Sequence, residues 1–192
     1  MTIREAINIA DAVAPNALTN DLKTQFLNEV EGVVQTEVFL LSINEIEKYL
    51  YAATYTGEVC FPDAKTMKFK TPHGYSVGGT VTISGLTTYS GNNSDTPRII
   101  GNVTDKYTVR FDEDTFTDTG DTGDSGTVEY DGSGAVLLVE PPHDKLYWHY
   151  LVSMIHFANA DYDRYQNTMQ LYNESFGEFM RWFAQVYRPA DR

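Results

Sequence analysis

The sequence is poor in cysteine, in basic residues and in long apolar runs, and each shortage argues against a class of protein. Cys60 is the only cysteine among 192 residues, so an internal disulfide, a zinc ribbon and CxxC chemistry are excluded. Lys and Arg number 14 against 27 Asp and Glu, which gives a net charge of −13. Binding nucleic acid through its phosphates requires clustered Lys and Arg side chains, so the composition argues against that mode of binding.

No stretch approaches the ~18 consecutive apolar residues of a membrane span, and the first residues lack the apolar core of a signal peptide. We therefore expect a protein that is neither secreted nor embedded in a membrane and that works in a reducing compartment. Its acidic charge fits simple solubility, and it also fits a conduit through which DNA passes without sticking. The charge alone does not distinguish these two interpretations.

The sequence offers no motif for catalysis. It lacks nucleotide-binding glycine loops and the GxSxG nucleophile motif. His149 and His156 lie seven residues apart on one expected helix, about 10.5 Å along its axis, which is too far for both to bind one metal. His73 and His143 have no acidic or cysteine partner at a metal-ligand spacing, and Cys60 has no basic neighbour to activate it. We predict no catalytic residue, no metal ligand and no cofactor, and so a protein that is not an enzyme.

The run Asp118–Gly126 contains the Asp-Thr-Gly triplet of aspartic proteases twice. In those enzymes the triplet lies in a buried loop that pairs two aspartates, whereas here it lies in a polar, glycine-rich stretch. The aspartates between Asp112 and Asp124 supply oxygen ligands suited to calcium, although their spacing matches no known calcium loop. We expect a flexible acidic turn and leave weak calcium binding open.

The first part of the chain predicts helices. Thr2–Glu5 has the pattern of a capping box, and a short helix is expected from Ile3 to Ala12. A second helix is expected to start at Thr19–Asp21, with Gly32 near its middle. Such a glycine costs about 1 kcal/mol relative to alanine, so we expect another segment to pack closely there. The expected inner face is Leu22, Phe26, Leu27, Val30, Val33 and Val34, and the expected solvated face is Glu29, Glu31 and Glu37. We expect helix to dominate as far as Tyr55.

The composition changes between Thr56 and Gly134, where Gly, Thr, Asp and Ser rise and β-branched residues alternate with polar ones. Short, evenly spaced strands of this kind predict a small antiparallel sandwich or barrel. Because helical segments precede and follow it, we interpret this module as an insertion. The candidate strands are Met67–Phe69, Thr80–Ile83, Ile99–Val103, Tyr107–Phe111, Thr115–Thr117 and Thr127–Tyr130.

After Pro141–Pro142 the pattern is helical again, and two helices joined by a short turn predict an antiparallel hairpin. Asp144 is the expected cap of the first helix and Asp161 that of the second, which should run from Tyr162 to Val186. The first helix should bury Leu146, Tyr150, Met154 and Phe157. The second should bury Tyr165, Met169, Tyr172, Phe176, Phe179 or Met180, and Phe183.

Several aromatic side chains of the hairpin fall outside these stripes, among them Tyr147 and Tyr162. Aromatics with arginines nearby are typical of the centres of protein interfaces. We predict that Trp148, Trp182, Tyr187 and Arg188 take part in contacts with other subunits. The expected fold class is α+β, with a helical core at 1–59 and 137–192 and the β module at 60–136.

Parts of the chain are similar to head–tail connector (adaptor) proteins of tailed phages and prophages, more specifically in the C-terminal part than in the N-terminal part. The N-terminal likeness lies in Asn28–Gly32 and Thr36–Leu40. The C-terminal likeness lies in Leu137–Tyr147, Tyr150–Leu151, Met154–Ile155, Phe157–Asn159, Asp161–Asn167 and Phe179–Phe183.

The resemblance implies a non-enzymatic virion protein that docks on the portal vertex as a ring, commonly of twelve copies. It would bridge the portal to tail and neck proteins, let DNA pass without specific binding, and occur in the host cytoplasm during assembly. The inserted β module departs from the compact family pattern, and Gly74–Gly85 is similar to small β units of phage virion proteins. The alternative is a phage decoration or binding module whose insert recognises glycan or capsid. Its expected binding face is Tyr75, Tyr89, Asn92 and Asn93.

Overall fold

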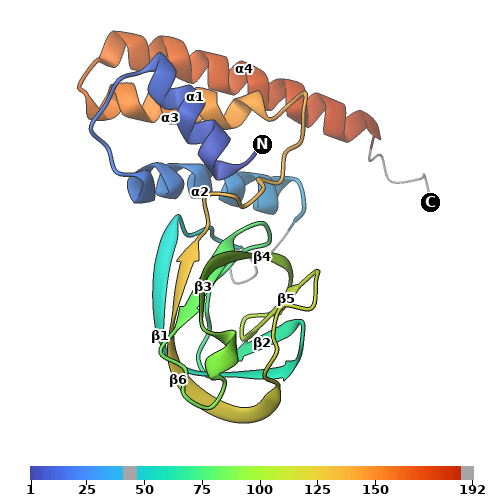
Figure 1. Ribbon diagram of the computed structural model, residues 1–192. Coiled ribbons are helices and arrows are strands. Elements are labelled where there is room, and N and C mark those ends of the chain that lie inside the picture. The colour runs from blue at the N-terminus through green and yellow to red at the C-terminus, as the bar shows by residue number, and fades with distance from the viewer. Residues whose placement is uncertain (41–46, 187–192) are drawn as a thin grey trace, which may run out of the picture. The chain divides into compact units, whose positions relative to one another are not determined.

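The computed structural model describes residues 1–40 and 47–186 and has an α+β fold made of two compact units. The helical unit comprises Met1–Lys48 and Leu137–Arg192, and the β unit comprises Tyr49–Val136. Each unit is drawn in Figure 1. The first boundary lies at 48/49 rather than at the expected 59/60, because strand β1 already begins at Ala52. The second boundary lies at 136/137.

The first two helices begin at the residues that the sequence indicates. Helix α1 spans Ile3–Val13, and its predicted capping box is confirmed, with the Glu5 amide donating to Thr2 Oγ1 over 3.2 Å and the Thr2 amide donating to Glu5 Oε2 over 2.8 Å. Helix α2 spans Asn20–Glu37, and the Thr19 hydroxyl accepts a hydrogen bond from the Leu22 amide at 3.3 Å. Both caps satisfy amides that the first helical turn leaves without a partner.

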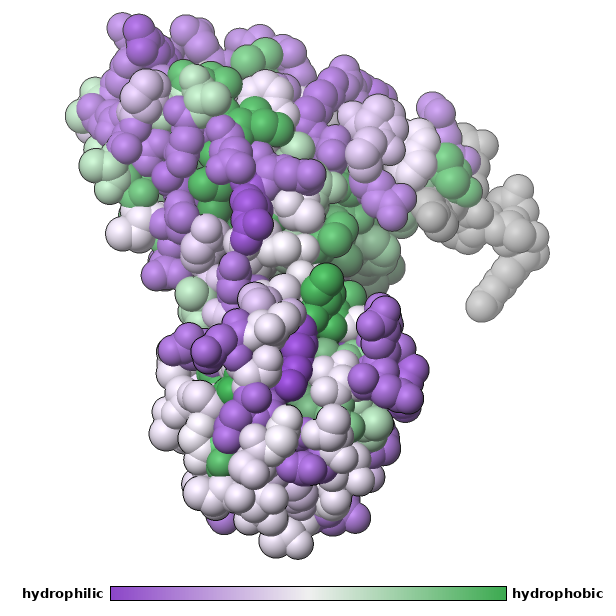
Figure 2. All heavy atoms as spheres, in the orientation of Figure 1, coloured by the Kyte–Doolittle hydropathy of each residue, from purple (hydrophilic) through white to green (hydrophobic). Residues whose placement is uncertain are grey.

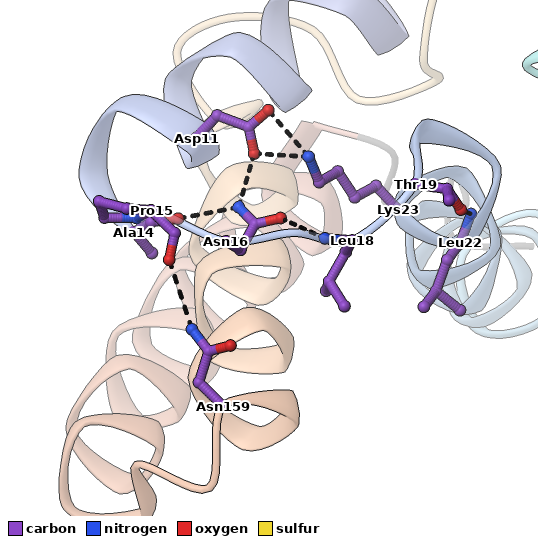
Figure 3. A network of polar contacts seen from close by, with 9 residues as sticks. All are labelled: Asp11, Ala14, Pro15, Asn16, Leu18, Thr19, Leu22, Lys23 and Asn159. Atoms are coloured by element: carbon purple, nitrogen blue, oxygen red, sulfur yellow. Dashed lines mark hydrogen bonds and ion pairs between the residues drawn. The ribbon is translucent and has the colours of Figure 1, made fainter.

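The connection between α1 and α2 is held by side chains that point toward one another (Figure 3). Asp11 forms an ion pair with the buried Lys23 at 2.7 Å and accepts a hydrogen bond from Asn16 Nδ2 at 2.8 Å. Asn16 Oδ1 in turn accepts from the Leu18 amide at 3.0 Å. Lys23 is therefore buried with its charge paired, which is the usual condition for a lysine in a protein interior.

Helix α3 spans Lys145–Ala158 and helix α4 spans Tyr162–Val186, the limits predicted for the last helix. Ring contacts pair Phe157 with Tyr165 and Tyr150 with Tyr172, so the two helices run antiparallel and the predicted hairpin is confirmed. Asp161 Oδ1 caps α4 by accepting from the Arg164 amide at 3.3 Å. Asp144 is the N-cap residue of α3, as expected, but its side chain makes no capping hydrogen bond.

Helix α3 is the central helix of the unit, since α1, α2 and α4 all pack against it. Its buried band is therefore wider than the predicted stripe and displaced from it: Phe157 is exposed, whereas Tyr147, expected off the stripe, is fully buried. The buried apolar residues of the four helices are Ile3, Ala6, Ile7, Ala10, Leu27, Val30, Val34, Leu146, Tyr147, Leu151, Val152, Ile155 and Phe179.

Glu31 on α2 also contradicts the prediction, because it was expected on the solvated face of the helix and is buried instead. Its side chain has 0% exposure. Glu31 Oε1 accepts hydrogen bonds from the Leu138 amide at 2.8 Å and from the Tyr147 hydroxyl at 2.7 Å. The turn of α2 around Glu31 is thus enclosed by α3 and by the segment that follows the β unit.

The β unit is a closed barrel of antiparallel strands in the order β1-β2-β5-β4-β3-β6, with β6 pairing back to β1. The longest pairing joins β1 and β6, from Ala52 opposite Asp131 to Phe61 opposite Gly120. The sequence left a sandwich and a barrel open, and the structure has the barrel. The strands are β1 Ala52–Asp63, β2 Thr66–Phe69, β3 Thr80–Ser84, β4 Ser94–Asp105, β5 Thr108–Phe111 and β6 Gly120–Asp131.

The predicted strands are confirmed except Thr115–Thr117, which is not a strand. The prediction also missed β1, whose first residues were assigned to helix, and the first half of β6. The barrel has its own apolar core, and the two ends of the unit lie together: Tyr49 Oη donates to the Val136 carbonyl over 3.2 Å. The core is formed by Val59, Phe61, Met67, Phe69, Tyr75, Val81, Ile83, Leu86, Tyr89, Ile100, Val109, Phe111, Phe116, Val128 and Tyr130.

Candidate interaction surfaces

The histidines, Cys60 and the acidic run are the residues to consider first for catalysis or metal binding. Within residues 1–40 and 47–186, no group of three or more His, Cys, Asp and Glu side chains could hold a metal ion. His149 Nδ1 lies 2.8 Å from Ser175 Oγ, and the Ser175 hydroxyl also hydrogen-bonds the Leu171 carbonyl at 2.9 Å. The carbonyl one turn earlier on α4 thus competes with His149 for the single hydroxyl proton of Ser175.

Cys60 lies half-buried on β1. Burial raises the pKa of its thiol, and the nearby Asp121 raises it further. A thiol with a raised pKa is less often the reactive thiolate. The site therefore has the electrostatics of an inert thiol.

The acidic run is not the flexible turn that the sequence predicts, because Gly120–Asp131 forms β6. Asp124 is buried, and its Oδ2 accepts hydrogen bonds from the amides of Thr87, Thr88 and Tyr89 at 2.9, 2.7 and 3.0 Å. These amide hydrogen bonds, with that of Tyr89 foremost, lower the pKa of the Asp124 carboxyl. Asp124 therefore holds the 87–89 turn in place.

The predicted binding face on the insert requires correction, because three of its four residues are buried. Tyr75, Tyr89 and Asn92 are 5%, 5% and 0% exposed. Tyr75 stacks on Tyr130 with ring centroids 4.2 Å apart. Asn93 is exposed, but its side-chain amide bonds both the amide and the carbonyl of Leu86, at 3.0 and 2.9 Å. These four residues support the barrel and its loop rather than present a common surface.

The contacts of Asn92 explain why the sequence wrongly predicted an exposed binding loop. Its Oδ1 accepts from the amides of Thr117 and Asp118 at 3.0 and 3.1 Å, and its Nδ2 donates to the Asp118 carbonyl over 2.7 Å. Asp118 in turn accepts from the Gly91 amide at 2.8 Å. A polar Asn-rich loop and an acidic run, far apart in sequence, thus satisfy each other, which composition alone does not reveal.

Helix α4 carries a long aromatic face that is only partly covered. Of its 25 residues only Ser175 and Phe179 are buried. Neighbouring rings follow the helix from one end to the other, with contacts Phe157–Tyr165, Tyr150–Tyr172, Tyr172–Phe176, Phe176–Phe179, Phe179–Phe183 and Phe39–Phe183 at centroid distances of 4.9 to 6.4 Å. The predicted stripe exists, but Tyr165, Met169, Tyr172, Phe176 and Phe183 are half-buried rather than core residues.

Two of the four predicted interface residues lie within the described range. Trp182 is exposed, with its ring 5.0 Å from that of His143, and Val186 one turn later is 56% exposed. Trp148 is half-buried beside His149. Tyr187 and Arg188 lie outside the described residues.

The sequence did not indicate a groove on α2 of about 560 Å³, lined by Gln25, Asn28, Glu29, Gly32, Val33, Thr36 and Lys48. A methyl group added at Gly32 would meet no atom of the described residues within 4 Å. The expectation that another segment packs closely on Gly32 is therefore wrong for the part of the chain that the structure describes.

The two units differ in their surfaces. On the face shown in Figure 2, the helical unit exposes green apolar patches among purple charged side chains. The β unit is mostly pale on the same face, in keeping with its Thr, Ser and Gly content. Exposed apolar surface of this kind marks candidate contact regions on the helical unit.

Comparison of the chain with protein-family models and with curated proteins gives no match. Within the described part of the chain, no helix combines the length and the apolar character needed to cross a membrane. What indicates a function for the chain is the sequence resemblance together with the surfaces described above.

Proposed function

We propose that the chain is a non-enzymatic structural protein of a tailed-phage virion, a head–tail connector. In this role it binds the portal vertex as a ring of identical copies and bridges it to tail and neck proteins. It is then found at the neck of the virion and, during assembly, in the host cytoplasm. Its partners are the portal, the tail proteins and further copies of itself, and DNA passes it without specific binding.

The observation that carries the proposal is the C-terminal hairpin, whose sequence resembles the connector family and whose aromatic face is left half-exposed. A ring of identical subunits uses heterologous contacts, so each subunit presents two different surfaces. Aromatic side chains supply most of the energy of such contacts. The net charge of −13 suits a subunit placed beside passing DNA.

The test is to purify the protein with and without a portal protein of a tailed phage, and to examine both by native mass spectrometry and negative-stain microscopy. We expect ring-shaped density on the portal vertex. A protein that stays monomeric with portal and binds sugar or capsid instead would overturn the proposal. That second outcome would favour the decoration-module alternative.

Two substitutions on α4 test whether this helix contacts the portal. Trp182→Ala removes an exposed aromatic ring, and Val186→Asp places a charge on an exposed apolar position. We expect each to weaken portal binding at least tenfold, which corresponds to about 1.4 kcal/mol. The matched control is Val77→Asp, which changes an equally exposed valine of the β unit and should leave binding unchanged.

The decoration-module alternative has lost its structural basis on the insert. It depended on Tyr75, Tyr89, Asn92 and Asn93 as a recognition face, and of these four side chains only Asn93 is exposed. This face therefore supports the alternative less than the half-exposed hairpin supports the connector.

A further inference from the structure

The chain crosses between the helical unit and the β unit twice, and the same helix anchors it beside both crossings. Before the first crossing, Gln35 on α2 bonds both backbone groups of Glu47: Nε2 donates to the carbonyl over 3.0 Å, and Oε1 accepts from the amide at 2.8 Å. After the second crossing, Glu31 Oε1 accepts from the Leu138 amide at 2.8 Å. We call Glu31 and Gln35 the α2 clamp.

The two clamp residues are four positions apart, so they lie on one face of α2. Both are buried, at 0% and 2% exposure. Hydrogen bonds in a buried site are strong because water does not compete for the groups. The α2 clamp therefore determines where the chain leaves the helical unit and where it returns.

The two halves of the clamp differ in how well they are satisfied. The Gln35 amide has both a donor and an acceptor contact, whereas the Glu31 hydrogen bonds all go to Oε1 and its Oε2 has no partner in the part of the chain that the structure describes. A buried carboxylate with an unpaired oxygen is costly when it is charged.

Among the described residues, the groups that donate hydrogen bonds to Glu31 are both neutral. They are the Tyr147 hydroxyl of helix α3 and the Leu138 amide of the segment after the β unit. Burial raises the pKa of Glu31, and these two hydrogen bonds oppose that shift without cancelling it. Lys23, the buried lysine of α2, is already paired with Asp11 and lies eight residues away, about 12 Å along the axis.

We propose that the α2 clamp is a proton-operated latch, closed on the Leu138 segment when Glu31 is neutral and released from it when Glu31 ionises. The proposal concerns the attachment of the chain to α2, and it does not depend on the connector function.

The direction of the effect follows from proton linkage. A carboxyl whose pKa is higher in the closed state binds its proton more tightly there, so protonation favours the closed state. Closure is strongest below the ordinary glutamate pKa of about 4.3 and is lost as the pH rises through the raised value. A lower pH therefore favours the closed state, in which Glu31 accepts the hydrogen bond of the Leu138 amide.

Amide hydrogen exchange of the whole protein, followed residue by residue across this pH range, tests the latch. Exchange at Leu138 is divided by its intrinsic rate, so that only opening of the structure is counted. In the wild type we expect protection at Leu138 to fall by up to tenfold per pH unit, the limit for one linked proton. In Glu31→Gln, which keeps the accepting oxygen and cannot ionise, protection should not change with pH.

Two further variants keep the test independent of general instability. Glu37→Gln removes one exposed charge from the same helix and should keep the wild-type pH profile. Gln35→Ala should raise exchange at Glu47 while the pH profile at Leu138 persists. A flat profile at Leu138 in the wild type, or the same slope in Glu31→Gln as in the wild type, would overturn the latch.

Discussion

A single hydroxyl group joins three segments of the helical unit. Tyr147 on α3 donates to Glu31 on α2 over 2.7 Å and accepts from the Val139 amide at 2.9 Å. Its side chain is fully buried. Removing the oxygen would leave the Val139 amide without this acceptor and Glu31 with a single donor.

We expect Tyr147→Phe to lower the free energy of unfolding of the helical unit by about 1–3 kcal/mol, the cost of buried groups left without partners. Tyr150→Phe is the matched control, since its hydroxyl bonds Glu29 at an exposed position and should matter less. Both tryptophans belong to the helical unit, so tryptophan fluorescence during urea unfolding reports on this unit. Equal effects of the two variants would contradict the assignment.

Asp124 makes the barrel sensitive to acid. Its pKa is lowered in the folded state, so its contribution is present above the unfolded value of about 3.9 and is lost as the pH falls through the folded value. We expect Asp124→Asn to reduce protection of β6 amides from exchange at neutral pH and to flatten the loss of protection on acidification. Asp121→Asn, at an exposed position of the same strand, should behave like the wild type. Identical profiles for the two variants would refute this role.

At the scale of the element, α2 combines a buried polar face with a face that none of the described residues covers. Gly32 belongs to the uncovered face. No described residue packs closely enough to require a glycine at this position. Glycine inside a helix is destabilising because it gains the most conformational freedom on unfolding.

We therefore expect Gly32→Ala to raise the stability of the helical unit by roughly 0.5–1 kcal/mol, seen as a higher melting temperature. Gly126→Ala is the contrasting variant, because its added methyl group would lie 2.7 Å from Leu86 Cδ2 and 3.0 Å from the Ser84 carbonyl oxygen. That variant should destabilise the barrel. A lower melting temperature for Gly32→Ala would show that α2 needs glycine at this position.

Helix ends were predictable from the sequence because caps are local. Thr2, Thr19 and Asp161 bond amides three residues ahead, so their role is visible in a few letters of sequence. The burial of individual side chains was not predictable from the sequence, because it depends on contacts with residues far away in the chain. Glu31 looks like a surface glutamate until Leu138, 107 residues later in the chain, donates a hydrogen bond to it.

The strands of the barrel were also predicted only where the local sequence pattern was enough. The short apolar strands were found by their alternation, but β1 and the start of β6 were missed. Gly120–Asp131 is rich in Asp and Gly and has low intrinsic strand propensity. It forms a strand because it pairs with β1 on one side and β3 on the other. The predicted face at Tyr75 and Tyr89 failed for a related reason, since their partners lie far away in sequence.

At the scale of the molecule, the two units have separate cores, and the β unit begins and ends at adjacent positions. Besides the Tyr49 contact to Val136, the Gly132 amide donates to the Tyr51 carbonyl over 2.8 Å. A closed barrel also leaves no edge strand that needs cover from another segment.

We predict that residues 49–136 expressed alone fold into the same barrel. The expected result is a dispersed amide spectrum and slow amide exchange in β1 and β6, with a cooperative unfolding transition. Phe61→Ala is the control, because it removes a fully buried core ring and should cost about 3–5 kcal/mol. A disordered 49–136 fragment would mean that the barrel depends on the helical unit to fold.

The paired ends of the barrel also bear on the order in which the chain folds. Glu31 and Leu138 are 107 residues apart, which makes their contact a slow, entropically costly loop closure for an open chain. Once the barrel has joined Tyr49 to Val136, the free path between Glu31 and Leu138 shortens to about twenty residues, and the closure entropy falls by about 1.5 kcal/mol. Formation of the barrel thus shortens the loop that must close between Glu31 and Leu138. We expect the helices on either side of it to assemble faster when the barrel forms first.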